Sequence, residues 1–246
     1  MALNSRTGTA ARAAVMTAVV LALGTCRAAA TPTVAVPVTL PSGPTLQESW
    51  TARIEYPVLA RKTPGGRVVA QLEHVSYYSR RAALYMVTGS QKLANGKVWI
   101  RIQLPKRPNG LNGWVPSDAV ALRRHHTWIR VSRATKTVRV FTDGKQIKVF
   151  KAAVGTGGTP TPAGLFAVHD VVPVSGLLGP YILALTAHSR VLKTFAGGDG
   201  TIGIHGWPDR EALGKAVSHG CVRMSRTGVQ QLKKWARPGI PVEIVG

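Results

Sequence analysis

Hydrophobic and polar residues alternate along most of the chain, which is the pattern of strands that bury one face. Beyond residue 126 the pattern recurs in "TWIRVS", "TVRVF", "QIKVFKAAVG", "GLFAVHDVV", "YILALTAH", "GTIGIHG" and "PVEIV". The pair Asp143-Gly144, between the second and third of these segments, is typical of a two-residue hairpin turn. Residues 126–246 are therefore expected to form a mostly β domain.

Helical spacing appears only near the end of this region. In "SRTGVQQLKKWA", Val229, Leu232 and Trp235 fall on one helical face, and Ser225 is a suitable N-cap. The segment "EALGKAV" is weakly helical. One or two short helices are expected, so the predicted fold class is mainly β.

Residues 50–124 contain a separate series of short strand patterns. Segments such as "RVVAQLE" and "NGKVWIRIQL" alternate with turn signals such as "TPGG". About five short strands in this length predict a small β-barrel. The stretch "KVWIRIQLPKRPNGLNGWVPSDAV" resembles the end of a bacterial Src-homology-3-like barrel, and no catalytic residue is evident in it. We expect this module, if it has a function of its own, to bind the cell wall.

The N-terminal 30 residues are typical of an export signal. Arg6 and Arg12 precede an apolar run, Ala13 to Gly24, and three alanines then offer a cleavage site. The run is too short to remain as a transmembrane anchor after cleavage. The predicted location is therefore the cell envelope or wall, in a periplasmic type of space. In the alternative interpretation, Cys26 within "LGTC" is lipidated.

Residues 31–49 contain four prolines and almost no charge, which predicts an extended linker. The whole chain is strongly basic, with a formal net charge of +22. Its basic residues are spread over both regions and are not gathered into a stripe with interleaved aromatics. We therefore expect no nucleic-acid partner, and an anionic envelope or a general compositional bias explains the charge.

Chemistry centres on Cys221, the only cysteine left once the export signal is removed. A single thiol cannot form an intramolecular disulfide. Three interpretations are possible for it: a small buried residue, a zinc ligand together with His205 and His219, or a nucleophile. Zinc ligands usually occur in closely spaced pairs, and only His219 is close to Cys221 in sequence, so we expect no metal and no cofactor.

A nucleophilic thiol needs a lowered pKa and a base. The helix expected after Ser225 would favour negative charge at its N-terminus, and Arg223 is nearby. His205 ends an apolar strand that can aim its ring at the sulfur. The backbone N–H groups of Gly220 and Cys221 are candidates for an oxyanion hole.

The segment "IGIHGWPDREALGKAVSHGCVRMS" resembles the signature of the L,D-transpeptidase catalytic-domain family, and "AVGTGGTPTPAGLFAV" is similar to an upstream segment of that family. The resemblance implies a mixed β-sandwich. It also implies that Cys221 is the nucleophile, that His205 accepts and donates the proton, and that the Gly206 carbonyl holds the other ring nitrogen.

The same resemblance gives expectations for the residues around the thiol. Ser218, His219 and Gly220 would shape the substrate pocket, and Arg223 occupies a position where the family has Arg or Asn. A flap is expected within residues 173–200.

The implied reaction joins peptidoglycan stem peptides. The thiolate attacks a tetrapeptide donor, D-alanine leaves, and the amine of an acceptor stem then takes the acyl group. Water as the acceptor would make the protein an L,D-carboxypeptidase. A different hypothesis is a non-catalytic wall-binding module in which the thiol is incidental.

Overall fold

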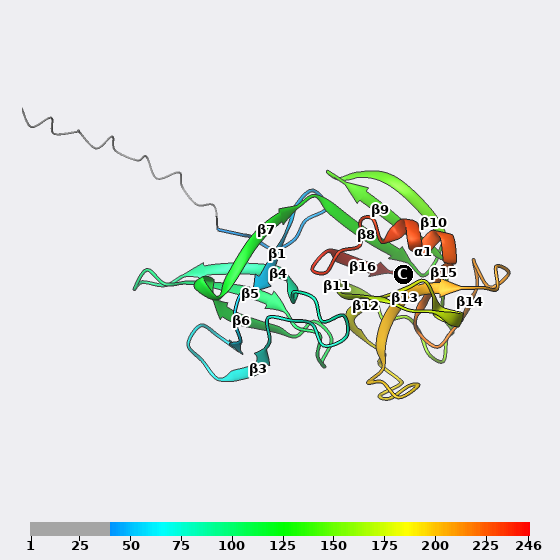
Figure 1. The fold of residues 1–246 in the computed structure, drawn as a ribbon. Helices are drawn as coiled ribbons and strands as arrows, with labels where there is room; N and C mark the ends of the chain where they lie inside the picture. The colour runs from blue at the N-terminus through cyan, green and yellow to red at the C-terminus, as the bar shows by residue number, and fades with distance from the viewer. Residues whose placement is uncertain (1–39) are drawn as a thin grey trace, which may run out of the picture. The chain divides into compact units, whose positions relative to one another are not determined.

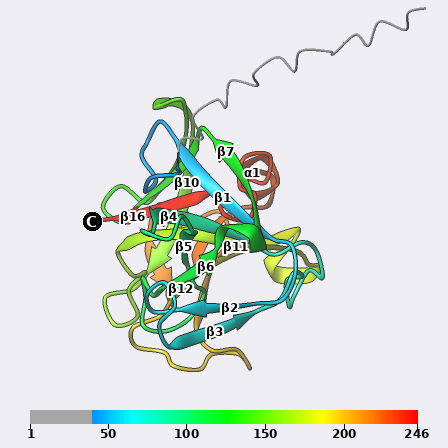
Figure 2. The same ribbon diagram turned by 90° about the vertical axis from the view of Figure 1, so that its left-hand side faces the viewer.

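Seven strands of the computed structural model, which describes residues 40–246, form one antiparallel sheet. They are β1 (Ser49–Ile54), β2 (Val58–Arg61), β3 (Val68–Leu72), β4 (Leu84–Lys92), β5 (Val98–Gln103), β6 (Asn112–Pro116) and β7 (Val120–His125), with a short 3-10 helix η1 (Ser117–Ala119) before β7. The order across the sheet is β3-β2-β6-β5-β4-β1-β7 (Figures 1 and 2).

No pairing joins the outer strands β3 and β7 within residues 40–246. By its hydrogen bonds this first sheet is therefore open, where a small closed barrel was expected. The resemblance to a Src-homology-3-like barrel stays a prediction. In β5 the expected alternation is present, because Ile100 and Ile102 are fully buried while Arg101 between them is exposed.

The second region contains nine strands, a short 3-10 helix and one α-helix. They are β8 (Thr127–Ser132), β9 (Thr137–Thr142), β10 (Lys145–Gly155), β11 (Gly164–Pro173), η2 (Gly176–Leu178), β12 (Tyr181–His188), β13 (Thr201–Trp207), β14 (Ala216–Ser218), β15 (Val222–Ser225), α1 (Arg226–Leu232) and β16 (Pro241–Val245). The strand order is β14-β10-β15-β13-β12-β11-β16-β8-β9, and β9 also pairs with β10.

This last pairing closes eight strands into a mixed β-barrel, with β14 beside β10. A mixed sandwich was expected, and the closure depends on β10. The first part of that strand pairs with β9 and its end pairs with β15 and β14. The predicted Asp143-Gly144 hairpin between β9 and β10 is confirmed, with φ of 50° and 75°.

The interior of this barrel is filled by large apolar side chains from nearly every strand. Fully buried examples are Ile129, Leu185, Ile204 and Val222. They come from β8, β12, β13 and the start of β15, so the strands that carry the candidate site are held by the main core.

The helix α1 begins where the sequence predicts. Ser225 caps it, since its Oγ accepts a hydrogen bond of 3.0 Å from the Gly228 N–H. The helix ends at Leu232, so Trp235 lies beyond it and packs, partly buried, on the core. The helix expected in "EALGKAV" is wrong: Gly214 has φ of 94° and its N–H bonds to Ala152 O, which directs the chain into β14.

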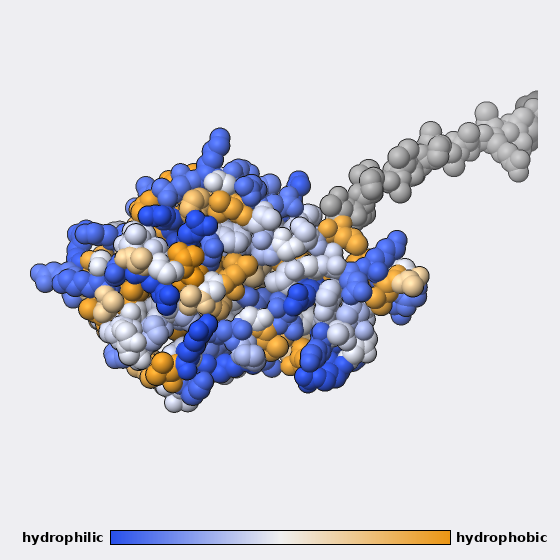
Figure 3. Space-filling model, turned by 180° about the vertical axis from the view of Figure 1, so that it is seen from behind, coloured by the Kyte–Doolittle hydropathy of each residue, from blue (hydrophilic) through white to orange (hydrophobic). Residues whose placement is uncertain are grey.

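Residues 39–246 form one compact unit, so the two sheets can be described together. No helix within residues 40–246 is long and apolar enough to cross a membrane. The predicted export signal (1–30), Cys26 and the first part of the predicted linker (31–39) lie outside the described residues. Figure 3 shows hydrophilic side chains spread over one face with small hydrophobic patches between them.

Candidate active site

The adjacent strands β13 and β15 bring the predicted histidine and cysteine together. The two strands are parallel neighbours, with His205 opposite Arg223. Because side chains alternate along a strand, His205 shares a face with Gly203, and Cys221 shares a face with Arg223. Cys221 precedes β15 by one residue, and its Sγ accepts a hydrogen bond of 3.4 Å from the Gly203 N–H.

Both side chains open into one cavity of about 570 Å³, a volume typical of small-ligand sites. Its polar residues include His205, His219, Cys221 and Arg223. The rest of its wall is largely apolar and includes Tyr78, Leu177, Ile182, Leu192, Phe195 and Trp207. The cavity therefore has a reactive end and an apolar remainder.

His205 is buried and its ring is fixed by its own strand. Its Nδ1 lies 2.8 Å from the main-chain oxygen of Gly206, and because a carbonyl only accepts, Nδ1 carries the proton. This leaves Nε2 as the ring nitrogen with a free lone pair. Burial lowers the pKa of His205; the Gly206 carbonyl raises it by less, and the Arg223 charge adds a smaller lowering, so the ring is neutral near pH 7.

A side chain at position 206 would not fit. A Cβ there would overlap the main-chain oxygen of Gly179, in the loop between η2 and β12. The strand that carries His205 therefore packs directly against the backbone of that loop, which positions the loop beside the cavity.

The thiol of Cys221 is not activated in the way the sequence suggested. Burial raises its pKa, and the Gly203 N–H and the Arg223 charge lower it by less. The prediction that the N-terminus of α1 lowers the pKa of this thiol is wrong. The four residues of β15 separate Cys221 from α1. A strand rises about 3.3 Å per residue, so the thiol lies too far from the helix N-terminus to be stabilised by its dipole. The resting group is a neutral thiol that needs a base.

A network of hydrogen bonds fixes the turn Ser218–Gly220 ahead of the thiol. The Ser218 Oγ donates to Cys221 O (2.5 Å) and accepts from the Gly220 N–H (3.1 Å). Gly220 has φ of 123°, which favours glycine. Its N–H is already engaged within the turn, so of the two donors considered for an oxyanion hole only Cys221 N–H remains.

Sequence reasoning missed Thr161, which holds the same turn from outside. It is completely buried and donates through Oγ1 to Gly220 O (2.8 Å), while Oγ1 accepts from the Gly155 N–H (2.8 Å). The signal was present in the "GTPTPAG" segment, where a threonine is followed by a proline. A buried hydroxyl with two backbone partners there joins β10 to the cysteine turn.

His219 and Arg223 line the cavity in different ways. His219 is exposed, and its ring lies 5.1 Å from that of Phe195. The Arg223 guanidinium lies 3.8 Å from the centre of the Trp207 ring, a cation–π contact. Trp207 therefore has two roles: it lines the cavity and supports Arg223.

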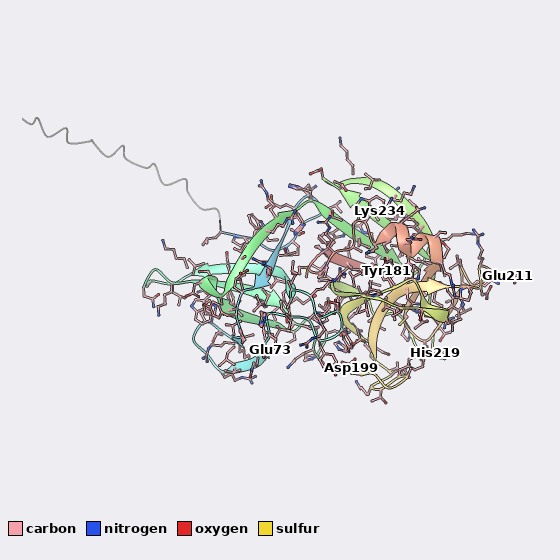
Figure 4. The ribbon with its side chains drawn as sticks, in the orientation of Figure 1. Glu73, Tyr181, Asp199, Glu211, His219 and Lys234 are labelled. Atoms are coloured by element: carbon pink, nitrogen blue, oxygen red, sulfur yellow. The ribbon has the colours of Figure 1, made fainter. Side chains whose placement is uncertain are left out.

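The carboxylates that could have oriented a histidine lie elsewhere. Asp209 accepts a 2.8 Å hydrogen bond from the Glu211 N–H on an exposed loop. Glu211 points outward at the end of the domain (Figure 4). The expected flap also divides into two: residues 174–180 and 189–200 are loops beside the cavity, whereas β12 between them is a central strand. Among residues 40–246 no group of three or more His, Cys, Asp or Glu is placed to hold a metal ion.

Comparison with known proteins agrees with the geometry. Residues 126–244 match the family model described as the L,D-transpeptidase catalytic domain, YkuD. Proteins named as the L,D-transpeptidase YkuD in Bacillus licheniformis and Bacillus subtilis are each 32% identical over 117 residues. The aligned part is 47% of this chain and spans 64% of the length of each relative.

Solved structures of related enzymes are more distant. The catalytic domain of an Enterococcus faecium L,D-transpeptidase is 24% identical, with a TM-score of 0.38 over 48% of this chain and 95% of that chain. An L,D-transpeptidase from Mycobacterium smegmatis is 16% identical, with a TM-score of 0.40 over 64% and 97% of the two chains. The assignment rests on the family match over residues 126–244. Residues 126–244 of this chain belong to the L,D-transpeptidase catalytic-domain family, which is a family of enzymes.

Proposed function

We propose that this protein is an exported L,D-transpeptidase that cross-links peptidoglycan stem peptides through a thioester on Cys221. The observation that carries the proposal is the placement of Cys221 and His205 on neighbouring strands, facing one cavity. A thiol and a neutral imidazole in one rigid pocket are the two groups that acyl transfer requires.

The first half of the reaction forms the acyl-enzyme. His205 Nε2 takes the thiol proton as Sγ attacks the carbonyl carbon next to the terminal D-alanine of the donor. Negative charge develops on the carbonyl oxygen, where the Cys221 N–H is the donor that remains free of the turn. The C–N bond then breaks, His205 returns the proton to the departing amine, and D-alanine leaves.

The second half uses the amine of an acceptor stem. The amine nitrogen attacks the thioester carbonyl, His205 accepts the amine proton, and the C–S bond breaks as the proton returns to sulfur. A new amide joins the two stems and the enzyme is restored. A neutral His205, supported by its lowered pKa, is required at the start of each half.

Arg223 supports binding of a donor with a terminal carboxylate. It lines the cavity, where its guanidinium lies over the Trp207 ring. A carboxylate that entered the cavity would pair with the guanidinium. We infer that Arg223 pairs with the terminal carboxylate of the donor peptide.

The test measures D-alanine release and cross-linked dimer from disaccharide tetrapeptides by mass spectrometry. Cys221→Ala and Cys221→Ser should abolish both products. Tyr77→Ala, which changes an exposed side chain outside the cavity, is the control and should leave both products unchanged. Full activity of the Cys221 variants would refute the proposed nucleophile, and D-alanine release without dimer would identify a carboxypeptidase instead.

A second measurement separates an enzyme from a wall-binding module. Incubation with a carbapenem should add one drug mass to the wild-type protein and none to Cys221→Ala. Sedimentation of Cys221→Ala with purified cell walls tests the wall-binding role of the first sheet. Sedimentation without any adduct or product from the wild type would favour the binding module.

A further inference from the structure

The first sheet reaches the catalytic cavity through two of its loops. We propose that it completes the substrate pocket: Tyr78, between β3 and β4, contacts the donor, and Arg107, between β5 and β6, is a positioning residue for the segment 189–200. The inference rests on the proposed function as far as the donor is concerned. It assigns the first sheet a direct part in the catalytic site in addition to any wall binding.

Arg107 holds the segment 189–200 through three main-chain oxygens. Its Nη1 donates to Ser189 O (2.6 Å), and its Nη2 donates to Leu192 O (3.1 Å) and Asp199 O (2.8 Å). These oxygens lie at the beginning, middle and end of the segment. One planar guanidinium therefore ties the two ends of the loop together.

The beginning of the segment has a second attachment to the same loop of the first sheet. Asn109 Nδ2 donates to His188 O (2.8 Å), and the His188 N–H donates to Asn109 Oδ1 (2.8 Å). At the other end, Gly200 has φ of 77°, and a Cβ there would overlap Leu192 O and lie 2.8 Å from Arg107 Nη2. A glycine at position 200 therefore allows the middle and end of the segment to pack together beside the guanidinium.

The held segment forms part of the cavity wall. Leu192, Phe195 and Gly200 line the cavity, although residues 193–199 are exposed to solvent. Asp199, which closes the segment, is labelled in Figure 4. Apart from the bond between Arg107 and Leu192, the hydrogen bonds of residues 190–198 are local ones, such as those between Phe195 and Gly198. Exposed loops with few attachments open readily, so the three bonds from Arg107 govern how far this wall can move.

Tyr78 is placed by a buried carboxylate of β11. Asp170 is 1% exposed, and its Oδ2 accepts hydrogen bonds from the Ser76 hydroxyl and from the Ser79 N–H (3.1 Å). These two residues flank Tyr78, so the loop is fixed on both sides of it. Tyr78 lines the cavity, whereas Tyr77 beside it is 80% exposed and does not.

The chemistry of this wall predicts what it binds. Tyr78, Leu192 and Phe195 present aromatic and aliphatic surface, while His205, Cys221 and Arg223 form the reactive end. A donor whose scissile amide lies at Cys221 would place an aliphatic part of its peptide against this apolar wall. We assign Tyr78 the role of a contact for that aliphatic part.

Steady-state kinetics on the tetrapeptide donor test Tyr78. Tyr78→Ala should raise KM by about 10-fold or more, with kcat changed less. Tyr77→Ala is the matched control and should leave KM unchanged. Equal KM values for the two variants, in a wild-type protein that turns over the donor, would overturn the role of Tyr78 and leave the proposed function intact.

Alkylation of Cys221 by iodoacetamide tests Arg107 and requires no substrate. Arg107→Ala should raise the alkylation rate by about 10-fold, because the segment 189–200 loses the hydrogen bonds that restrain its opening. Arg107→Lys should give an intermediate rate. Arg67→Ala, an exposed arginine of the same sheet, should match the wild type. Thermal unfolding of each variant checks that the fold is kept.

A rate for Arg107→Ala equal to that of Arg67→Ala would overturn the positioning role. This measurement gives an answer even if the wild-type protein releases no D-alanine. The alkylation rate therefore tests the role of Arg107 independently of D-alanine release, which tests the proposed function.

Discussion

The two sheets of this protein are built from similar alternating strands but differ in closure. The first sheet is antiparallel and open, and the second closes into a mixed barrel through the β9–β10 pair. Within residues 40–246 the thiol belongs to the closed barrel, where it directly precedes β15 and lies beside the buried histidine of the neighbouring strand β13. Closure fixes every strand on both sides, which gives the reacting groups a rigid frame, while the open sheet contributes loops.

Two glycines, one in each sheet, give the strongest test of how the closed barrel and the open sheet differ. A Cβ at Gly206 in the barrel would overlap the main-chain oxygen of Gly179, whereas a Cβ at Gly113 in the first sheet would press on the side chains of Ala60 and Leu104. The main chain of that loop can yield less than the side chains around Gly113. Gly206→Ala should abolish D-alanine release, and Gly113→Ala should keep activity and lose about 1–3 kcal/mol of stability.

Release of D-alanine and thermal unfolding, measured on both variants, check this prediction. Gly157→Ala is a neutral control, since nothing lies within 4 Å of a Cβ at that position. Equal effects of the Gly206 and Gly113 variants would show that closure confers no added rigidity on the site.

Core truncations test whether the two regions unfold together. Ile204 in the barrel and Ile100 in the first sheet are both fully buried, and truncation of either to Ala should cost about 2–5 kcal/mol. Buried Gln103 of the first sheet bonds to Leu165 O (2.9 Å) and Thr186 Oγ1 (2.6 Å) of the barrel. We therefore expect each variant to lower one shared transition in urea, and two separate transitions would contradict this.

Acid should destabilise the first sheet through His125. Burial, followed by the charges of Arg123, Arg237 and His126, lowers the pKa of His125 to about 4. Below pH 6.5 the unfolded chain takes up a proton that the folded chain refuses, so stability falls as pH decreases from 6.5 to about 4. His125→Gln should reduce this fall, as judged from urea midpoints at pH 7 and 4.5. An unchanged midpoint shift would contradict the assignment.

In the barrel, a lowered histidine pKa affects activity, whereas that of His125 affects stability. The lowered pKa of His205 keeps its ring neutral below the usual imidazole value of 6.5. The kcat/KM for the donor should therefore stay near its pH 7 value at pH 6, and decline only at lower pH. A decline centred at 6.5 or above would contradict His205 as the base.

The smallest expected effect concerns the cap of α1. Ser225→Ala removes the hydrogen bond to the Gly228 N–H and should cost about 1 kcal/mol. The helix follows the cysteine strand and does not touch the thiol, so D-alanine release should be unchanged. Loss of activity at full stability would mean that the helix influences Cys221 after all.

Local pattern was sufficient for most strands of the barrel. The segments "TWIRVS", "YILALTAH" and "PVEIV" coincide with β8, β12 and β16, because alternation and turn residues are local properties. The strands β14 and β15 were missed, since they are short and the Ser218–Gly220 turn interrupts the pattern between them. Closure of the barrel was missed because it depends on two partners of one long strand, β10.

The site was predictable only as far as its motif extends. Cys221 and His205 could be selected because both lie within one recognisable segment. Tyr78 and Arg107 are distant in sequence, and their place beside the cavity depends on contacts such as that of Asp170 with Ser79. The pKa of the thiol also required the structure, because the length of β15 decides whether α1 can affect it.

The parallel register of β13 and β15 determines where insertions and deletions can be tolerated. The exposed residues 208–211 can change in number, or carry a peptide tag, as long as β15 still meets β13 with Arg223 opposite His205. Removal of one residue between Ser218 and Cys221 would instead turn the sulfur toward the opposite face of the sheet. The distance along the chain between the histidine and the cysteine is thus adjustable, whereas the spacing of the cysteine from its own strand is not.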